Sequence, residues 1–318
     1  MSPESKTSPL TGPGFEALSS RVENLKRRAG ICSAARSFFE SRGYLEVETP
    51  VLIPSPAPEP HIDAVQAGGM FLHTSPELCM KRLLAAGYSR IFQICKCFRS
   101  GERGSLHTPE FTMLEWYRAG CDYRDLMQET EELILEIASS LDLGTGIPFA
   151  GKTIDLSHPW QSISVKEAFA RHSPVPLETA LEKDLFDEIM VVHIEPRLGI
   201  HRPAFIYDYP ASMAALARTK LSDPSVAERF ELYIAGIELA NGFSELTDQL
   251  EQENRFREAE QQRRSVGKPP YPPPRKFLSA LAHMPEAAGI ALGIDRLAMV
   301  LCDTAEIADV VTFTPEEL

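Results

Sequence analysis

The spacing of apolar positions separates this chain into helical and strand-like segments. Helical spacing predicts helices over 25–41 and 76–87, each ending at a glycine that suits a left-handed cap. It also predicts an amphipathic helix that Asp122 caps, with Leu126, Leu133, Ile134 and Ile137 on its apolar side. A charged helix is expected to end near residue 264.

Alternating apolar positions predict the strands, and prolines mark the loops between them. The expected strands cover 44–47, 70–73, 91–98, 111–117, 230–234 and 237–241, and a final strand-helix unit covers 290–301. Segments 54–60 and 268–274 are proline-rich and are expected to be irregular. The stretch 153–209 is less regular, with a capping box at Ser164 and Glu167 and a helix over 185–195. Strands that cluster without long βαβ alternation predict an α+β fold, an antiparallel sheet flanked by helices.

Composition is ordinary for a globular protein, with 43% hydrophobic and 24% charged residues among 318. No apolar run reaches the roughly 18 residues of a membrane span. Residues 1–14 are rich in Ser, Pro, Thr and Gly and have no signal-peptide core. We therefore expect a disordered tail over 1–17, one catalytic domain over 18–318 and a cytoplasmic protein.

The net charge of −13 argues against an extended nucleic-acid surface, which is usually basic. The alternative is that this acidity only aids solubility. Six cysteines are scattered, and Cys95 and Cys97 flank Lys96 in an apolar strand, so their side chains share one face. Reduced core thiols and a zinc site are the two interpretations of that pair.

A first segment with chemistry runs over 97–117, where charged residues interrupt strand-like sequence. Phe111, Met113, Glu115 and Tyr117 fall on one face of the second strand. Arg99 ends the first strand, where its guanidinium can hold a phosphate while the Phe111 ring stacks on a base. The alternative is a surface hairpin whose core face is Phe and Met.

A second segment, over 230–246, places Glu238 in an apolar strand and Glu245 seven residues later, past an expected Asn-Gly turn. Buried carboxylates need a cation. The two could share Mg²⁺, or one could face a substrate ammonium; the alternative is an ordinary hairpin with solvated acids. In a third segment, over 289–297, an apolar strand runs into a helix whose Arg296 can reach a phosphate.

In this order the three segments resemble motifs 2 and 3 of class II aminoacyl-tRNA synthetases, with an amino-acid-binding segment between them. The runs His-Thr-Pro-Glu-Phe-Thr-Met-Leu-Glu (107–115) and Gly-Ile-Glu-Leu-Ala-Asn-Gly-Phe-Ser-Glu-Leu (236–246) are similar to the lysyl branch. Residues 43–50 resemble motif 1, whose proline, here Pro50, sits at a dimer interface. The resemblance covers about residue 18 to the C-terminus and implies a homodimer.

Motif 1 begins near residue 40, which leaves no room for the anticodon-binding domain of lysyl-tRNA synthetases. The chain is therefore most similar to the elongation factor P–(R)-β-lysine ligases, stand-alone paralogues that form an aminoacyl-adenylate and acylate a lysine of elongation factor P. The run 73–87 looks like their substrate strand and helix. Ala291 stands where lysyl-tRNA synthetases usually have Gly, and its methyl group changes the pocket shape. Changing Ala291 to Gly is expected to improve the use of α-lysine over (R)-β-lysine.

The resemblance assigns roles position by position. The amino-acid substrate, lysine or (R)-β-lysine, is expected to contact Ser75, Pro76, Glu77, Tyr117, Glu245 and Ala291. ATP is expected to contact Arg99, Ser100, Gly101, Glu102, Thr108, Phe111, Glu238, Leu239, Gly293 and Arg296. Arg99 and Arg296 would be catalytic, and Glu238 and Glu245 would hold Mg²⁺. Two positions depart from the family pattern, since Gly101 replaces the usual Glu with Glu102 following it, and Thr108 replaces Asn.

These assignments imply that ATP activates the substrate carboxylate and that the acyl group then passes to a protein lysine. No stable tRNA binding is expected. Two other functions stay open from the sequence. One is a minimal lysine-tRNA ligase or a ligase with a small-molecule acceptor, and the other is a non-enzymatic paralogue that binds an amino acid and regulates a partner.

Overall fold

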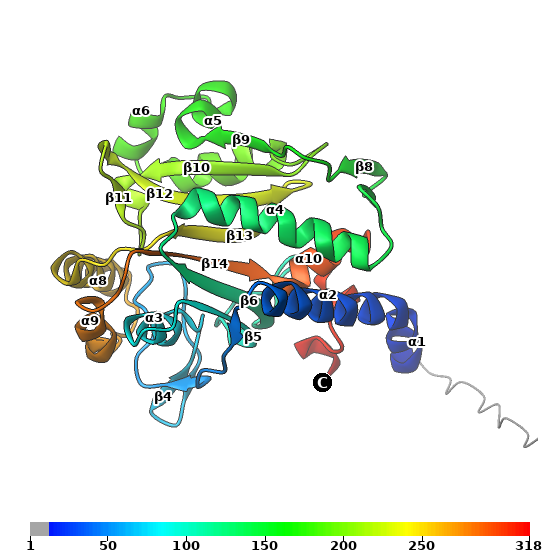
Figure 1. The fold of residues 1–318 in the computed structure, drawn as a ribbon, viewed down its shortest axis with the longest axis horizontal. Coiled ribbons are helices and arrows are strands. Elements are labelled where there is room, and N and C mark those ends of the chain that lie inside the picture. The colour runs from blue at the N-terminus through cyan, green and yellow to red at the C-terminus, as the bar shows by residue number, and fades with distance from the viewer. Residues whose placement is uncertain (1–12) are drawn as a thin grey trace, which may run out of the picture.

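A twisted nine-stranded sheet forms the centre of the protein in a computed structural model that describes residues 13–318 (Figure 1). Along the sheet lie β1 (Leu45–Glu46), β5 (Arg90–Phe98), β6 (Glu110–Ala119), β14 (Ala287–Gly293), β13 (Ile237–Ser244), β12 (Asp223–Ile234), β10 (Ala204–Pro210) and β9 (Gln161–Ser164), and β11 (Thr219–Lys220) pairs with β12. The pairs are antiparallel except β1–β5 and β9–β10 at the two edges. The predicted α+β architecture is confirmed, with parallel pairs added at its edges.

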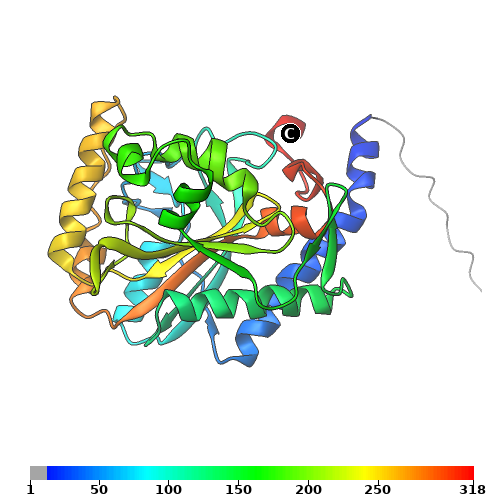
Figure 2. The ribbon, with the colours of Figure 1, turned by 90° about the horizontal axis from the view of Figure 1, so that it is seen from above.

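One face of the sheet is buried under α2 (Val22–Ser41), α4 (Tyr123–Ser140) and α10 (Ile294–Leu301). Every second residue of the central strands, such as Leu114, Trp116 and Ile290, packs against these helices. The capping box at Asp122 starts α4, as predicted. Seen from above, α4 lies on one side of the sheet and the lime-green helices after β9 lie on the other (Figure 2).

The opposite face is covered at its two ends and carries polar side chains between them. At one end α3 (Glu77–Ala85) and α9 (Arg275–Leu281) pack on Ile91 and Tyr117, beside α8 (Gln249–Ser265). At the other end α5 (Val165–His172), α6 (Leu177–Glu182) and α7 (Phe186–Ile189) pack on β10. The helix expected over 185–195 begins as α7, continues as a π-helical turn (Met190–Ile194) and ends as a 3₁₀ turn (Glu195–Arg197).

The remaining elements are short. They are the strands β2 (Leu52–Ile53), β3 (Gln66–Ala67), β4 (Met70–Leu72), β7 (Gly146–Phe149) and β8 (Lys152–Asp155), and the 3₁₀ turns Ala211–Met213, Ile307–Asp309 and Pro315–Glu317. Helix α9 was not predicted. The tail expected over 1–17 is wrong for 13–17, because these residues begin α1 (Pro13–Ser20). Residues 1–12 lie outside the described part. Among the helices that the structure describes, none combines the length and the apolar character that a membrane crossing needs.

The predicted Asn-Gly turn is wrong. Asn241 and Gly242 lie inside β13, and the chain reverses at Ala235 and Gly236, whose φ angles of 56° and 77° suit a two-residue hairpin loop. Glycine is needed at 242 for packing, since a Cβ there would lie 2.7 Å from the Phe230 ring.

Candidate active site

A lysine is buried between two carboxylates where α3 faces the end of β13. Lys81 Nζ lies 2.5 Å from Glu77 Oε1 and 2.5 Å from Glu245 Oε2, and the lysine side chain is 1% exposed. Glu77 and Lys81 meet because residues four apart share a helix face. This four-residue spacing could have identified Lys81 as a partner of Glu77 from the sequence alone. The sequence interpretation missed it. Apart from this ion pair with Lys81, Glu245 has no hydrogen-bond partner in the described range, so its Oε1 can take a further donor.

A third carboxylate, Glu115, is buried beside this pair. Its oxygens accept hydrogen bonds from Ser75 Oγ (2.8 Å) and Tyr117 Oη (2.5 Å). Burial, followed by the negative charge of Glu77, raises the pKa of Glu115 to about 8. Burial likewise raises the pKa of Glu245 to about 8, although Lys81 lowers it. The sequence placed Glu115 on the correct face but gave it no role.

The charges in this acid pocket, formed by Glu77, Lys81, Glu115 and Glu245, do not balance among the described residues. Three carboxylates face one lysine, which leaves two negative charges in excess when all are ionised. A ligand that carries ammonium groups supplies the missing charge. The pocket therefore fits a cationic substrate.

The wall of the pocket comes from β14. A Cβ at Gly289 would lie 2.1 Å from the Tyr117 ring and 2.6 Å from Glu245 Oε1, so only glycine fits there. Ala291 follows on the same face, paired with Glu115 and half-buried. The structure thus brings together all six predicted substrate residues, with Pro76 directly preceding α3.

A second cluster surrounds Arg99, which directly follows β5 and lies beside the start of β6. Its guanidinium carbon lies 5.0 Å from the Phe111 ring centre, and its Nε is buried without a hydrogen-bond partner in the described chain. Gly101 has φ +81°, and the chain returns so that Glu102 Oε1 lies 3.7 Å from Arg99 Nη1. Ser100 N donates to the Asp63 carbonyl (2.7 Å), which holds this turn against the loop after β2.

Arg296 faces the same cluster from the start of α10, just after Gly293. Its Nη1 donates to the carbonyl oxygen (2.9 Å) and Oε2 (3.2 Å) of Glu238, and its Nη2 lies 2.6 Å from His107 Nε2. Burial, then Arg296, lowers the pKa of His107, while Glu102 and Glu238 act in the opposite direction. Charged groups from three separate segments therefore surround one imidazole.

Two predicted ATP contacts are buried. Thr108 is 6% exposed, and the side chain of Leu239 packs in the core under α10, so only the backbone of Leu239 faces the site side of the sheet.

The sequence interpretation placed Glu238 and Glu245 together around one metal ion, which stays a prediction. Glu238 lies on β13 and Glu245 directly follows its last residue, and seven residues of extended chain span roughly 23 Å. Glu238 instead faces Glu231 across the hairpin, because the register pairs Tyr233 with Glu238 and places Glu231 on the same face.

Glu231 is the carboxylate that the sequence interpretation missed, although it lies seven residues before Glu238 on the other side of the turn. It accepts hydrogen bonds from Tyr209 (2.5 Å), Tyr233 (2.9 Å) and Arg229 (2.6 Å). Burial raises the pKa of Glu231, Arg229 lowers it and Glu238 raises it further. Two adjacent carboxylates that repel one another suit a divalent cation.

A mostly antiparallel sheet with two arginines at its centre and a buried acid pocket is the architecture of a class II aminoacyl-tRNA synthetase catalytic domain. Residues 18–317 match the family of tRNA synthetases class II (D, K and N). The protein named "Elongation factor P--(R)-beta-lysine ligase" of Salmonella arizonae is 40% identical over 93% of this chain and 96% of its own length. The protein of the same name from Erwinia tasmaniensis is 39% identical with the same coverage. The chain belongs to this family of ligases within the class II synthetases.

Proposed function

We propose that the chain joins (R)-β-lysine to ATP as an aminoacyl-adenylate and transfers the β-lysyl group to a lysine side chain of elongation factor P. Family membership makes it an ATP-dependent ligase, and the names of its relatives supply the acceptor and the isomer. The observation that carries the substrate assignment is the acid pocket, which carries two surplus negative charges once its three carboxylates are ionised and so matches the two ammonium groups of a lysine isomer.

The pocket residues divide between the two amines of the substrate. Glu245, whose Oε1 has no partner in the described chain, binds one ammonium group, while Glu77 and Glu115 bind the other beside Ser75 and Tyr117. The backbone at Pro76 closes the end of the pocket that Glu77 and Glu115 line. The methyl group of Ala291 changes the shape of the pocket wall on β14 and favours (R)-β-lysine over α-lysine.

Arg99 and Arg296 bind the phosphates of ATP. Phe111 stacks on adenine, and the turn at 100–102 with Thr108, Gly293 and the Leu239 backbone encloses the nucleotide. The substrate carboxylate attacks the α-phosphorus, pyrophosphate leaves, and the two guanidinium groups stabilise the negative charge that develops. The free Nε of Arg99 fits this role.

Glu231 and Glu238 would hold Mg²⁺. Their repulsion and the neighbouring Glu195 make this corner of the site acidic. When bound, the ion neutralises phosphate charge. Arg229, Tyr209 and Tyr233 orient Glu231, so this carboxylate points in a fixed direction.

The functional unit we propose is a homodimer in the cytoplasm. Leu45, Val51 and Leu52 are large, exposed apolar residues, and Pro50 is exposed between them in the motif 1 segment. A second copy would bury them. The net charge of −13 supports a protein acceptor over tRNA.

Intact-mass measurement of elongation factor P tests this function. With ATP, Mg²⁺ and (R)-β-lysine, the native enzyme should add the mass of one lysyl group to elongation factor P, and Arg296→Ala should not. An unchanged mass, together with charging of lysine tRNA in the same mixture, would favour a minimal tRNA ligase instead.

A further inference from the structure

One lysine in the acid pocket is in contact with carboxylates from two different elements. Lys81 Nζ lies 2.5 Å from Glu77 Oε1, at the start of α3, and 2.5 Å from Glu245 Oε2, just after β13. Two oxygens that are each this close to one nitrogen can lie no more than about 5 Å apart, twice that distance. Lys81 therefore fixes the separation of two carboxylates that would otherwise repel one another.

The lysine is itself held in place. Its side chain is 1% exposed, and Nζ lies 4.8 Å from the centre of the Phe243 ring on β13. Glu77 and Lys81 are four residues apart on one face of α3, so helix geometry alone brings them together. Burial lowers the pKa of Lys81, but Glu245 and Glu77 raise it above its usual value, so the ammonium group stays charged.

The two carboxylates lie at different depths in the pocket. The side chain of Glu245 is 0% exposed and that of Glu77 is 15% exposed. In the proposed reaction Glu245 binds one ammonium group of the substrate and Glu77 helps to bind the other. Lys81 lies between these two positions, and because an ammonium group is only a donor, it cannot bind either amine itself. Its effect on the substrate must pass through the two carboxylates.

Docking of α3 on the sheet does not require this group of charges. Leu78, Met80 and Leu84 of α3 are buried in the core that closes this end of the sheet. Replacing a buried ion pair by apolar side chains is often neutral or stabilising. Packing alone therefore does not account for a charged residue at position 81.

We propose that Lys81 is a positioning residue that sets the distance between the two amine-binding carboxylates and thereby the carbon-chain length of the diamino acid that the enzyme accepts. The inference rests on the proposed function. In a substrate that is one methylene shorter, one ammonium group does not reach its carboxylate, because Lys81 keeps Glu77 and Glu245 from moving toward it. Without Lys81 each carboxylate can follow its own ammonium group, and the pocket loses this discrimination.

Pyrophosphate exchange with two diamino acids tests this role. The two are (R)-β-lysine and (R)-3,5-diaminopentanoate, which has one methylene less between its amines. We expect the native chain to prefer (R)-β-lysine by at least about tenfold in kcat/KM, the usual effect of one methylene. Lys81→Met, which keeps an apolar stem and removes the charge, should reduce this preference to less than about threefold, chiefly through KM.

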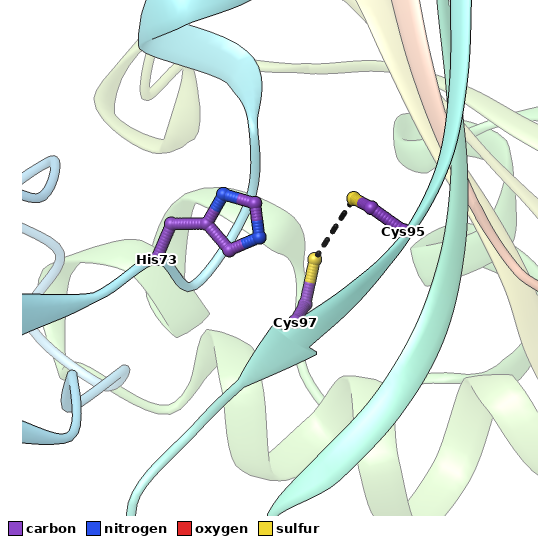
Figure 3. A group of neighbouring side chains, drawn as sticks. All are labelled: His73, Cys95 and Cys97. Carbon is purple, nitrogen blue, oxygen red and sulfur yellow. Dashed lines mark hydrogen bonds between the residues drawn. The ribbon is translucent and has the colours of Figure 1, made fainter. Parts of the chain in front are cut away.

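Cys97 offers a matched control, because it is buried on the same face of the sheet as Glu115 but lies outside the acid pocket. It neighbours His73 and Cys95 (Figure 3), and its sulfur lies 4.0 Å from Cys95 Sγ and 4.0 Å from Met113 Sδ. Cys97→Ser alters this buried group and leaves the contacts of Lys81 in place. The preference for chain length should therefore stay native, and a loss as large as that in Lys81→Met would overturn the proposal.

A purely structural role for Lys81 would reduce the use of both acids equally, and an unchanged preference in Lys81→Met would therefore overturn the proposal. Lys81→Arg covers the case in which thermal unfolding shows that Lys81→Met does not fold. It keeps the charge, but its wider guanidinium group holds the carboxylates at another separation, so the preference should again fall. A native preference in Lys81→Arg would contradict the spacing role.

The same assay separates this inference from the proposed function. If the native chain exchanges pyrophosphate with neither acid, the proposed function fails and the role of Lys81 fails with it. If the native chain uses (R)-β-lysine and both Lys81 variants keep its preference, only the role of Lys81 is contradicted.

Discussion

At the scale of single residues, the site depends on groups whose charge is set by burial. Glu115 and Glu245 are held at pKa values of about 8 because the pocket removes them from water, and at Glu245 Lys81 offsets only part of this. Arg99 and Arg296 sit in a less buried region and keep donors free for phosphates. The same sheet face thus offers an acidic end for amines and a basic end for ATP.

The turn at Gly101 carries a testable residue-level consequence. Glu102 lies 3.7 Å from Arg99, where the left-handed Gly101 has turned it toward the ATP site. Changing Glu102 to Ala should slow adenylate formation by about ten- to a hundredfold at limiting ATP, the equivalent of roughly 1.5–3 kcal/mol. Pyrophosphate exchange over a range of ATP concentrations measures this. An unchanged rate and ATP dependence would show that Glu102 is a solvated bystander.

The raised carboxyl pKa values predict a pH-dependent affinity for the substrate. In the free protein Glu115 and Glu245 are mostly protonated at pH 7, and a bound ammonium group lowers their pKa. Binding should therefore release nearly two protons at pH 7, and affinity should rise from pH 6 to 8 and then level off. Calorimetry in two buffers of different ionisation enthalpy measures the release. Glu245→Gln should reduce it, and zero release in the native chain would contradict the pocket's charge state.

At the scale of elements, the β12–β13 hairpin determines which carboxylates cooperate. Its turn lies at Ala235–Gly236, so Glu231 and Glu238 come together on one face while Glu245 is carried to the far end of β13. The same strand therefore serves the proposed Mg²⁺ corner at one end and the acid pocket at the other.

This arrangement predicts different effects for two conservative variants. Glu231→Gln should raise the Mg²⁺ concentration needed for half-maximal pyrophosphate exchange and lower the rate by about ten- to a hundredfold. Glu245→Gln should raise the KM for the amino acid and leave the Mg²⁺ dependence unchanged. The reverse pattern would restore Glu245 as a metal ligand.

Much of this element layout follows from local patterns. The helix over 25–41, the paired strands around residue 104 and the cap at Asp122 were predictable because periodicity and capping are local properties. The hairpin turn was not, because Asn-Gly is a strong turn signal and the alternative at Ala235 depends on Phe230 and Ile290 packing over Gly242. Lys81 and Glu231 were missed because their roles arise from partners on other elements.

At the scale of the whole molecule, one sheet separates a packed face from a catalytic face. Helices α2, α4 and α10 bury the packed face. Helices α3 and α9 cover one end of the catalytic face, and α5, α6 and α7 cover its other end. The motif 1 segment at the sheet edge keeps exposed apolar side chains, which is the feature expected of a surface between two copies.

Light scattering checks the dimer. At micromolar concentration the native chain should scatter as about twice 35.3 kDa. Leu52→Glu should shift it toward the monomer, because it places a charge in the apolar segment, whereas Leu221→Glu, at a fully exposed position elsewhere, should not. A native monomer would contradict the proposed interface.

The central claim is that surplus buried carboxylates recognise both amines of a lysine isomer. ATP–pyrophosphate exchange with (R)-β-lysine and with (R)-3-aminohexanoate, the same acid without its terminal amine, tests it most directly. The unpaired pocket charge predicts that the analogue is used at least about a hundredfold less efficiently, as kcat/KM. Equal efficiency for the two acids would contradict the account.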